Sequence, residues 1–225
     1  MSEGPDSPET GVAGAGGDGA GIVFASGNAG KLAELDALLA PLGYRAHAQG
    51  AFGIEPVEET ATTFVENALL KARQATRVAG LPAIADDSGL EVDALGGAPG
   101  LYSARHAVRH GMGTGRPERR DADNNAFLLE QLRDVAPERR TARFRSVVVL
   151  LRHAEDPSPI IAQGVWEGRV LEQEASGGGF GYDPLFLNAD TQEPASRLAP
   201  ALKNRLSHRG KAVAGLLEAL AAHPL

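Results

Sequence analysis

Two adjacent carboxylates are the residues in this sequence that most clearly suggest chemistry. Asp86 and Asp87 follow an apolar run at residues 83–85 and come directly before Ser88 and Gly89. This pattern predicts a short buried strand over residues 82–87 that ends in a Ser-Gly turn. A divalent cation would offset the cost of burying these charges, because hard cations prefer carboxylate oxygens. A solvated acidic turn explains the pair when it is taken alone, so the interpretation depends on the other motifs.

A phosphate-binding loop is predicted where the first strand meets the first helix. Residues 21–25 have the apolar pattern of a strand, and the turn that follows consists of Ser26, Gly27, Asn28, Ala29, Gly30 and Lys31. Free backbone amides at a helix N-terminus attract an anion, and Lys31 adds a full positive charge. The segment differs from a Walker A loop at Ala25 and Leu32, so an ordinary P-loop nucleoside triphosphatase is not expected. The alternative is a plain strand-to-helix turn with a solvated lysine.

A second helix brings further charged residues. Thr63 and Glu66 have the spacing of a capping box, which predicts a helix that carries Lys71. Glu58 and Glu59 precede this helix, and one of them would complete the metal shell that the aspartates begin. Acids that favour a helix N-terminus and a solvated surface lysine are the simpler explanation of this segment alone.

The glycine-rich segment at residues 176–184 has the composition of a ligand-binding loop. Its glycines allow the backbone to approach a ligand closely. Phe180 and Tyr182, on either side of Gly181, offer ring faces that suit stacking on a nucleobase, and Asp183 offers an acceptor for a base edge. The alternative is a turn whose aromatic side chains fill the core.

A basic segment near the C-terminus is the second candidate for anion binding. Ser207 is predicted to cap the last helix, whose amphipathic pattern covers residues 212–222. His208 and Arg209 then lie in its first turn, where cations oppose the helix dipole unless an anion is bound. Together with Lys203 they form either an anion site or a solvated basic patch.

The remaining pattern predicts the elements that position these residues. The first helix is predicted to carry an apolar face and to end at Pro41 and Gly43; the face consists of Leu32, Leu35, Leu38 and Leu39. The second helix leads into the strand at residues 82–87, which gives the order β-α-α-β. Strands at 143–151 and 160–170 are predicted to form a hairpin, with residues 147–151 buried on both faces. These elements indicate an α/β fold.

Residues 106–120 are basic and contain glycines, which predicts a mobile loop, with Asp121 or Asp123 as the cap of the next helix. His106 and His110 have i, i+4 spacing but lack a third ligand, so they are interpreted as surface histidines. The serines at positions 88 and 103 stand outside any G-x-S-x-G elbow, so acyl transfer is not expected.

Composition narrows the class further. The chain has 225 residues, 43% hydrophobic and 23% charged, which suits one globular domain at residues 21–225. Residues 1–20 lack Lys and Arg and are predicted to be a disordered tail rather than a secretory signal. No apolar run is long enough to span a membrane. The absence of cysteine excludes disulfides and suits a cytoplasmic protein, and the net charge of −7 argues against broad nucleic-acid binding.

Taken in order, these motifs resemble the inosine triphosphate pyrophosphatase family, and its bacterial branch in particular. The matching segments are residues 26–31, 58–60, 63–68, 85–90, 95–105, 179–186 and 207–212. The resemblance implies an elongated mixed β-sheet flanked by helices, with two lobes and an active-site cleft between them. It also implies a homodimer that uses Mg²⁺ to hydrolyse ITP, dITP and XTP to the monophosphate and pyrophosphate.

The same resemblance assigns roles to individual residues. Asp87 is the proton acceptor that activates water, Asp86 helps to hold that centre, and Lys31 and Lys71 neutralise the triphosphate. Asp87 and Glu59 are the metal ligands, with Glu58 as the alternative to Glu59. The implied substrate contacts are Ser26, Gly27, Asn28, Ala29, Gly30, Lys31, Ser88, Phe180, Gly181, Tyr182, Asp183, Lys203, His208 and Arg209.

Two other functions use the same residues. A metal-dependent phosphatase would release orthophosphate from nucleotides or sugar phosphates with the same acids and lysines. A purine-triphosphate sensor would bind without turnover, although pure anion recognition gains nothing from paired carboxylates. The product of the reaction distinguishes these possibilities.

Overall fold

One mixed six-stranded sheet runs the length of the molecule and carries all the helices. The computed structural model describes residues 19–225, so the predicted tail lies almost entirely outside the described residues. The strands are β1 (Ala20–Phe24), β2 (Tyr44–Ala48), β3 (Ala83–Val92), β4 (Thr141–Leu151), β5 (Ile160–Val170) and β6 (Phe186–Asn188). Their order in the sheet is β2-β1-β3-β4-β5-β6, parallel from β2 to β3 and antiparallel from β3 to β6. The predicted α/β fold with a mixed sheet is confirmed.

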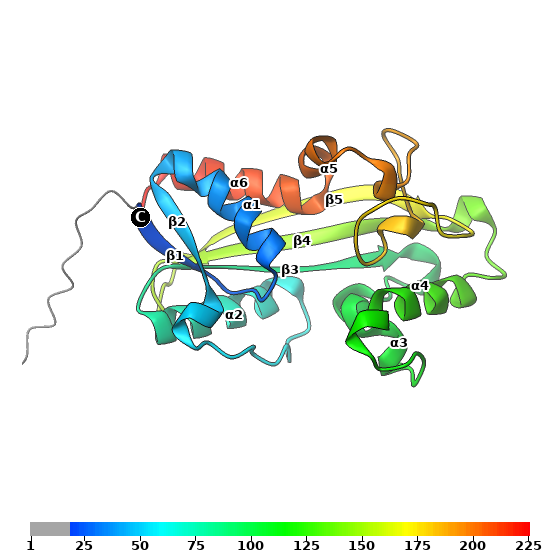
Figure 1. Ribbon diagram of the computed structural model, residues 1–225, viewed down its shortest axis with the longest axis horizontal. Helices are drawn as coiled ribbons and strands as arrows, with labels where there is room; N and C mark the ends of the chain where they lie inside the picture. Colours follow the sequence, from blue (N-terminus) through cyan, green and yellow to red (C-terminus); the bar gives the residue numbers. More distant parts are fainter. Residues whose placement is uncertain (1–18) are drawn as a thin grey trace, which may run out of the picture.

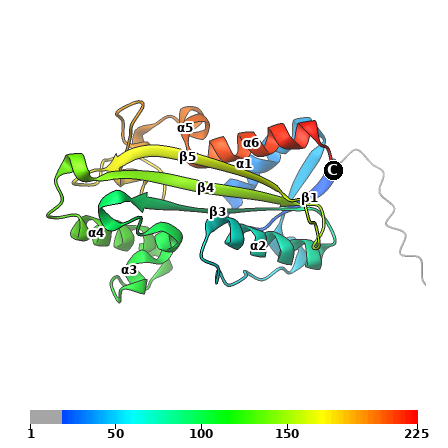
Figure 2. The same ribbon diagram turned by 180° about the vertical axis from the view of Figure 1, so that it is seen from behind.

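Helices cover the sheet unevenly along its length (Figure 1). They are α1 (Ala29–Leu39), α2 (Phe64–Ala79), α3 (His106–Arg109), α4 (Arg120–Gln131), α5 (Pro200–Leu206) and α6 (His208–Ala222). At one end of the long strands, α1 and α6 lie on one face and α2 lies on the other. At the other end, α3 and α4 lie on the side of α2, as the view from behind also shows (Figure 2). The result is an elongated molecule with two lobes joined by β3, β4 and β5.

Three hydrophobic clusters correspond to these layers. Beneath α1 and α6, one cluster is built around Ile22, Ile84 and Leu216. The α2 face is built from small residues and valines, which lets the helix lie close to the sheet. The lobe at the α3–α4 end of the sheet, called the distal lobe below, has a third cluster built around Trp166, with aromatic and aliphatic side chains from the strands, α4 and nearby loops. None of the helices among residues 19–225 is both long enough and apolar enough to cross a membrane.

Local sequence signals account for most of these elements. The Thr63 side chain accepts a hydrogen bond from the Glu66 amide at the start of α2, and the Ser207 side chain does the same for Gly210 at the start of α6. These are the predicted caps. The β4–β5 hairpin is also confirmed, and residues 147–151 are buried as predicted.

Strand β3 corrects the prediction of a turn after the aspartates. It continues through Ser88 and Gly89 to Val92, so Asp86 and Asp87 lie in the middle of a ten-residue strand. Gly89 marks a close approach rather than a turn, because a Cβ there would lie 2.2 Å from the Gly100 carbonyl oxygen.

The predicted β-α-α-β order is also wrong, because β2 lies between the first two long helices. β2 is an edge strand in which only Tyr44 is buried, so it lacks the apolar pattern of an internal strand. The predicted apolar face of α1 holds for Leu35 and Leu39, which are buried, but Leu38 is 42% exposed.

The basic segment at residues 106–120 is more ordered than predicted. It begins with helix α3, and His106 is buried with its imidazole Nε2 2.6 Å from Gln131 Oε1, so the interpretation as a surface histidine is wrong. Neither Asp121 nor Asp123 caps α4, whose N-cap is Arg119 without a side-chain hydrogen bond. Both carboxylates instead accept hydrogen bonds from other loops.

The ladder between β1 and β3 is short. It ends where Phe24 pairs with Ile84, and the next hydrogen bond on that edge of β3 joins the Leu90 amide to Ser103 Oγ at 2.8 Å. Between these points the edge of β3 is open toward the cleft that separates the lobes.

Candidate active site

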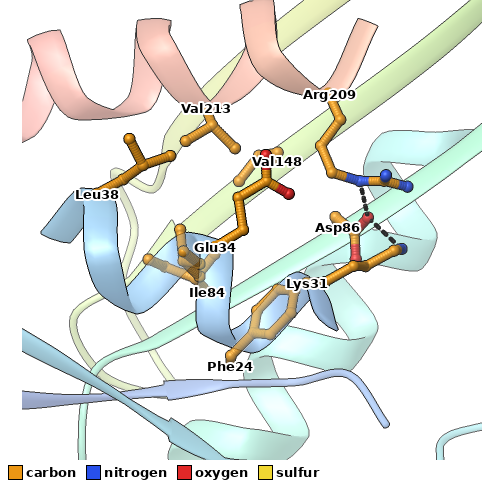
Figure 3. Close-up of a pocket in the computed structure, with 10 residues that line it drawn as sticks. Phe24, Lys31, Glu34, Leu38, Ile84, Asp86, Val148, Arg209 and Val213 are labelled. Atoms are coloured by element: carbon orange, nitrogen blue, oxygen red, sulfur yellow. Dashed lines mark hydrogen bonds and ion pairs between the residues drawn. The ribbon is translucent and has the colours of Figure 1, made fainter. Parts of the chain in front are cut away.

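The two adjacent aspartates serve opposite faces of the sheet. Successive side chains of a strand alternate between faces, and Asp86 therefore points toward α1 and α6. Its carboxylate lies 2.7 Å from Lys31 Nζ and 3.4 Å from Arg209 Nε (Figure 3). Asp87 points toward α2, where its carboxylate lies 2.9 Å from Lys71 Nζ and accepts a 3.4 Å bond from Asn67. The pair thus contacts two different sets of cations, although both aspartates line one cavity.

The Asp86 centre is a buried carboxylate between two cations. Burial alone would raise the pKa of Asp86, but the charges of Lys31 and Arg209 outweigh it and hold that pKa well below its usual range. The three charged groups close one end of a small, mostly apolar cavity of about 20 Å³ between α1 and α6 (Figure 3). Asp86 is therefore ionised at neutral pH and fixes the direction of both cations.

The Asp87 centre combines acids and a lysine. Lys71 Nζ contacts the carboxylates of Asp87 and Glu59, the latter at 3.1 Å, and Arg105 contacts Glu59 at 2.9 Å. Burial raises the pKa of Asp87, and the Glu59 charge adds to this effect while Lys71 opposes it. Burial works to lower the pKa of Lys71, but the nearby carboxylates outweigh it and raise that pKa. Asp87 is thus a carboxylate with increased affinity for a proton.

This donor set suits a hard divalent cation. Mg²⁺ is usually bound by one or two carboxylates together with substrate phosphates and water. Asp87 and Glu59 converge on one ammonium group, so both carboxylates already face a single positive charge. Within residues 19–225 no group of three or more His, Cys, Asp and Glu is arranged around one metal position. The phosphates of a substrate would therefore have to supply the remaining ligands.

The predicted phosphate loop lies beside this centre. Asn28 caps α1 by accepting a 3.0 Å hydrogen bond from the Lys31 amide, and Ser26 Oγ accepts one from the Asn28 amide at 3.3 Å. Ser26, Gly27 and Lys31 line a cavity of about 340 Å³ together with the acidic centre. The other lining residues that matter here are Glu59, Lys71, Asp86, Asp87 and Ser88. Ala29 and Gly30 form the first turn of α1 and line neither this cavity nor the one described next.

A second cavity of about 390 Å³ lies toward the distal lobe. Its most exposed aromatic side chain is Phe180, at 55% exposure. The ring has Lys203 Nζ 5.1 Å and the Arg209 guanidinium 5.7 Å from its centre. Lys203 is also paired with the buried carboxylate of Asp183 at 2.5 Å. An exposed ring with flanking cations is suited to stacking on a base and donating hydrogen bonds to it.

The other two predicted residues of this cavity are more buried. His208 stacks on Phe144 at 4.7 Å between ring centroids, and burial holds its pKa well below the usual value, so its imidazole is neutral. Its buried Nδ1 has no partner among the described residues. Tyr182 is a core residue, as the alternative interpretation expected, and its hydroxyl donates to the Ser103 carbonyl at 3.0 Å. Gly181 lines the cavity beside it.

Lys31 and Ser88 line both cavities, so the two cavities are neighbours along the open edge of β3. Glu58 has no contact with the acidic centre, whereas Glu59 does. Sequence reasoning missed Arg105, Asn67 and the cavity-lining Phe144. Asn67 and Arg105 lie in the matching segments 63–68 and 95–105, and Asn67 stands one helical turn before Lys71 on α2, so those segments carried a signal for both. Phe144 comes from β4, and no sequence pattern marked it.

The fold and the site define a nucleotide hydrolase of the α/β class, with an acidic centre next to a base-sized pocket. The model of the Ham1 family matches residues 22–219. A dITP/XTP pyrophosphatase of Xanthomonas campestris pv. campestris is 57% identical over 201 residues, which cover 89% of this chain and 97% of that protein. The chain belongs to the Ham1 family.

Solved structures agree with this assignment. A HAM1 protein from Coxiella burnetii is 42% identical with a TM-score of 0.83, covering 90% of this chain and 99% of that one. A nucleoside-triphosphatase named dITP/XTP pyrophosphatase from Mycobacterium abscessus is 41% identical with a TM-score of 0.69, covering 88% and 98%. The chain is accordingly an enzyme of the phosphoanhydride hydrolase class, and its family implies a divalent cation and a nucleoside triphosphate substrate.

Proposed function

We propose that this protein hydrolyses non-standard purine nucleoside triphosphates, namely dITP, ITP and XTP, to the monophosphate and pyrophosphate. The observation that carries this function is that the two cavities are neighbours that share Lys31 and Ser88 in their lining. One substrate can then place its base beside Phe180 and its phosphates at the acidic centre. The names of the 57% identical relative and of the Mycobacterium abscessus structure support the same substrates.

In the proposed reaction, water attacks the α-phosphorus while Asp87 accepts its proton. The new P–O bond forms as the α–β phosphoanhydride bond breaks, and pyrophosphate leaves with the bonding electrons. The Asp87 carboxylate lies in the cavity beside the phosphate loop, which suits it to accept a proton from a water molecule bound there. Lys31 and Lys71 would balance the charge of the triphosphate, and the Gly27 amide, which lines the same cavity, would donate a hydrogen bond to it.

We propose Mg²⁺ as the cation, with Asp87 and Glu59 as its protein ligands. When bound it would neutralise phosphate charge and polarise the phosphoryl group. Asp86 lines the same cavity but is paired with Lys31 and Arg209 rather than with Lys71. Its contribution to the centre is to hold Lys31, which reaches both cavities, in place.

Base selection would follow from donors in the second cavity. The O6 of hypoxanthine accepts hydrogen bonds, whereas the N6 amine of adenine donates them and would offer no acceptor to Lys203 or Arg209. We therefore expect Arg209→Ala to reduce activity on ITP more than any residual activity on ATP. An equal loss for both nucleotides would contradict this account of base selection.

Product analysis tests the proposed function directly. The protein is incubated with Mg²⁺ and dITP, ITP, XTP, ATP or GTP, and pyrophosphate, orthophosphate and monophosphate are quantified. Pyrophosphate from the non-standard nucleotides is expected, with loss of activity in Asp87→Asn. Asp93→Asn is the matched control, because Asp93 is an exposed carboxylate paired with Arg143 outside the cleft. Orthophosphate as the product would indicate a phosphatase, and binding without turnover would indicate a sensor.

We further propose that the protein is a homodimer that acts in the cytoplasm, where its substrates would arise. Light scattering on the full chain tests the first point, because a monomeric mass at micromolar concentration would contradict it. Fractionation of cells that express the protein tests the second. A nucleic-acid or membrane partner is not expected, given the net charge of −7.

A further inference from the structure

A carboxylate from helix α4 contacts the backbone of the glycine-rich loop. Asp121, in the first turn of α4, accepts a 2.7 Å hydrogen bond from the Gly181 amide, which is 60 residues away in the chain. The Asp121 side chain also lines the same cavity as Phe180. It is half-buried and has no role in the reaction described above.

This hydrogen bond is one half of a clamp on the loop backbone. The Phe180 amide donates to Asp183 at 2.9 Å, and the next amide, that of Gly181, donates to Asp121. Gly181 has a φ of 59°, a conformation that glycine adopts without strain. The Phe180 ring is 55% exposed, so few side-chain contacts hold it in place. Its direction therefore depends on how the backbone of residues 180 and 181 is fixed.

Helix α4 is itself held in place by hydrogen bonds to neighbouring segments. The buried Asn124 side chain accepts from the Ala107 amide at 2.9 Å and donates to the Ser103 carbonyl at 3.2 Å. That carbonyl also accepts the Tyr182 hydroxyl. The glycine-rich loop is thus tied to α4 directly through Asp121 and indirectly through Ser103.

We propose that Asp121 is a positioning residue that sets the Phe180 ring for base recognition by holding the Gly181 amide. The inference rests on the proposed function for the identity of the base. It gives a role to α4, which also places Arg120 and Asn124 in this cavity beside the glycine-rich loop and the helices α5 and α6. Because Asp121 acts through Phe180, its removal weakens substrate binding more than it slows the chemical step.

Steady-state kinetics with dITP test this role. Asp121→Ala is expected to raise KM about tenfold, equivalent to about 1.4 kcal/mol, with kcat changed less than threefold. Asp121→Asn keeps an acceptor for the amide and is expected to restore most of the loss. Asp123→Ala is the matched control, because it removes the same charge from the same helix end but contacts Thr114 instead of the loop. Equal KM values for the two alanine variants would overturn the proposal, as would a kcat defect without a KM defect.

A double-mutant cycle separates action through Phe180 from direct contact with the substrate. In a Phe180→Ala background, Asp121→Ala is expected to have less than a twofold effect on dITP binding, measured by calorimetry with Mg²⁺ and a dITP analogue whose α–β bridge resists hydrolysis. An undiminished tenfold effect in that background would show that Asp121 does not act through the ring. If the wild-type protein binds dITP but releases no pyrophosphate, the proposed function is refuted but the role of Asp121 is not. The double-mutant binding cycle then still decides that role. A wild-type protein that does not bind dITP overturns both.

Discussion

Helix α6 approaches β5 so closely at Gly164 that a single methyl group is expected to displace the base pocket. A Cβ at this position would lie 1.9 Å from the His208 carbonyl oxygen and 2.8 Å from the Ala212 amide nitrogen. Ordinary contact begins at 3.4 Å, so Gly164→Ala requires the first turn of α6 to move by about 1.5 Å. That turn carries His208 and Arg209, and a misplacement of about 1 Å in an active site can cost about 100-fold in rate.

We therefore expect Gly164→Ala to lower kcat/KM for dITP by roughly 100-fold and to reduce the free energy of unfolding by about 1–3 kcal/mol, the usual cost of overpacking. Pyrophosphate release and urea denaturation measure the two quantities. Gly215→Ala is the matched control on the same helix–sheet contact, because its Cβ would lie at an ordinary 3.5 Å from Ala162. It is expected to keep full activity and to gain up to about 1 kcal/mol in helix stability. A Gly164→Ala protein with wild-type kcat/KM would refute the reasoning.

Three further predictions concern stability and the cation. Arg152 holds the pKa of the buried Asp156 well below its usual range. The ionised carboxylate therefore stabilises the fold above its unfolded pKa of about 3.9, and this stabilisation is lost as pH falls toward the folded pKa. The stability difference between wild type and Asp156→Asn, measured by urea denaturation, should shrink below about pH 4, and a constant difference would contradict the assignment. Thr63→Ala removes the cap that Thr63 provides to the Glu66 amide and should cost about 1 kcal/mol, measured by thermal or urea unfolding, whereas an unchanged midpoint would show that the cap contributes nothing. Chelation of divalent cations should abolish pyrophosphate release from dITP, and added Mg²⁺ should restore it; activity that persists in chelator would argue against a metal at the acidic centre.

The sequence predicts those parts of the fold that short-range patterns specify. Capping at Thr63 and Ser207 depends on residues three positions apart, and the β4–β5 hairpin depends on two long apolar runs joined by a turn. Strand β2 could not be predicted in this way, because an edge strand buries few side chains and Arg45 and His47 interrupt its apolar pattern. The composition of Ser88-Gly89 is typical of a turn, but the glycine is required by a tertiary contact that no local pattern reveals.

The candidate site is predicted in its residue types more than in its arrangement. The motifs placed Lys31, Lys71 and the two aspartates together, and the structure brings them into one cleft. The division of the aspartates between the two faces follows from strand alternation only once both are known to lie inside a strand. Arg105 reaches the acidic centre from a segment distant in the chain, so its ion pair with Glu59 could be recognised only in the structure.

The point at which strand β1 ends limits how long that strand can be in a working enzyme. Its pairing with β3 stops at Ile84, and that break is what leaves the strand edge free beside Asp86 and Ser88. A strand two residues longer would continue the ladder, satisfy more backbone amides and fill the space where the two cavities meet. Engineering that extends β1 would therefore trade catalysis for stability, which makes the loop at residues 25–28 a poor place for stabilising strand-forming substitutions.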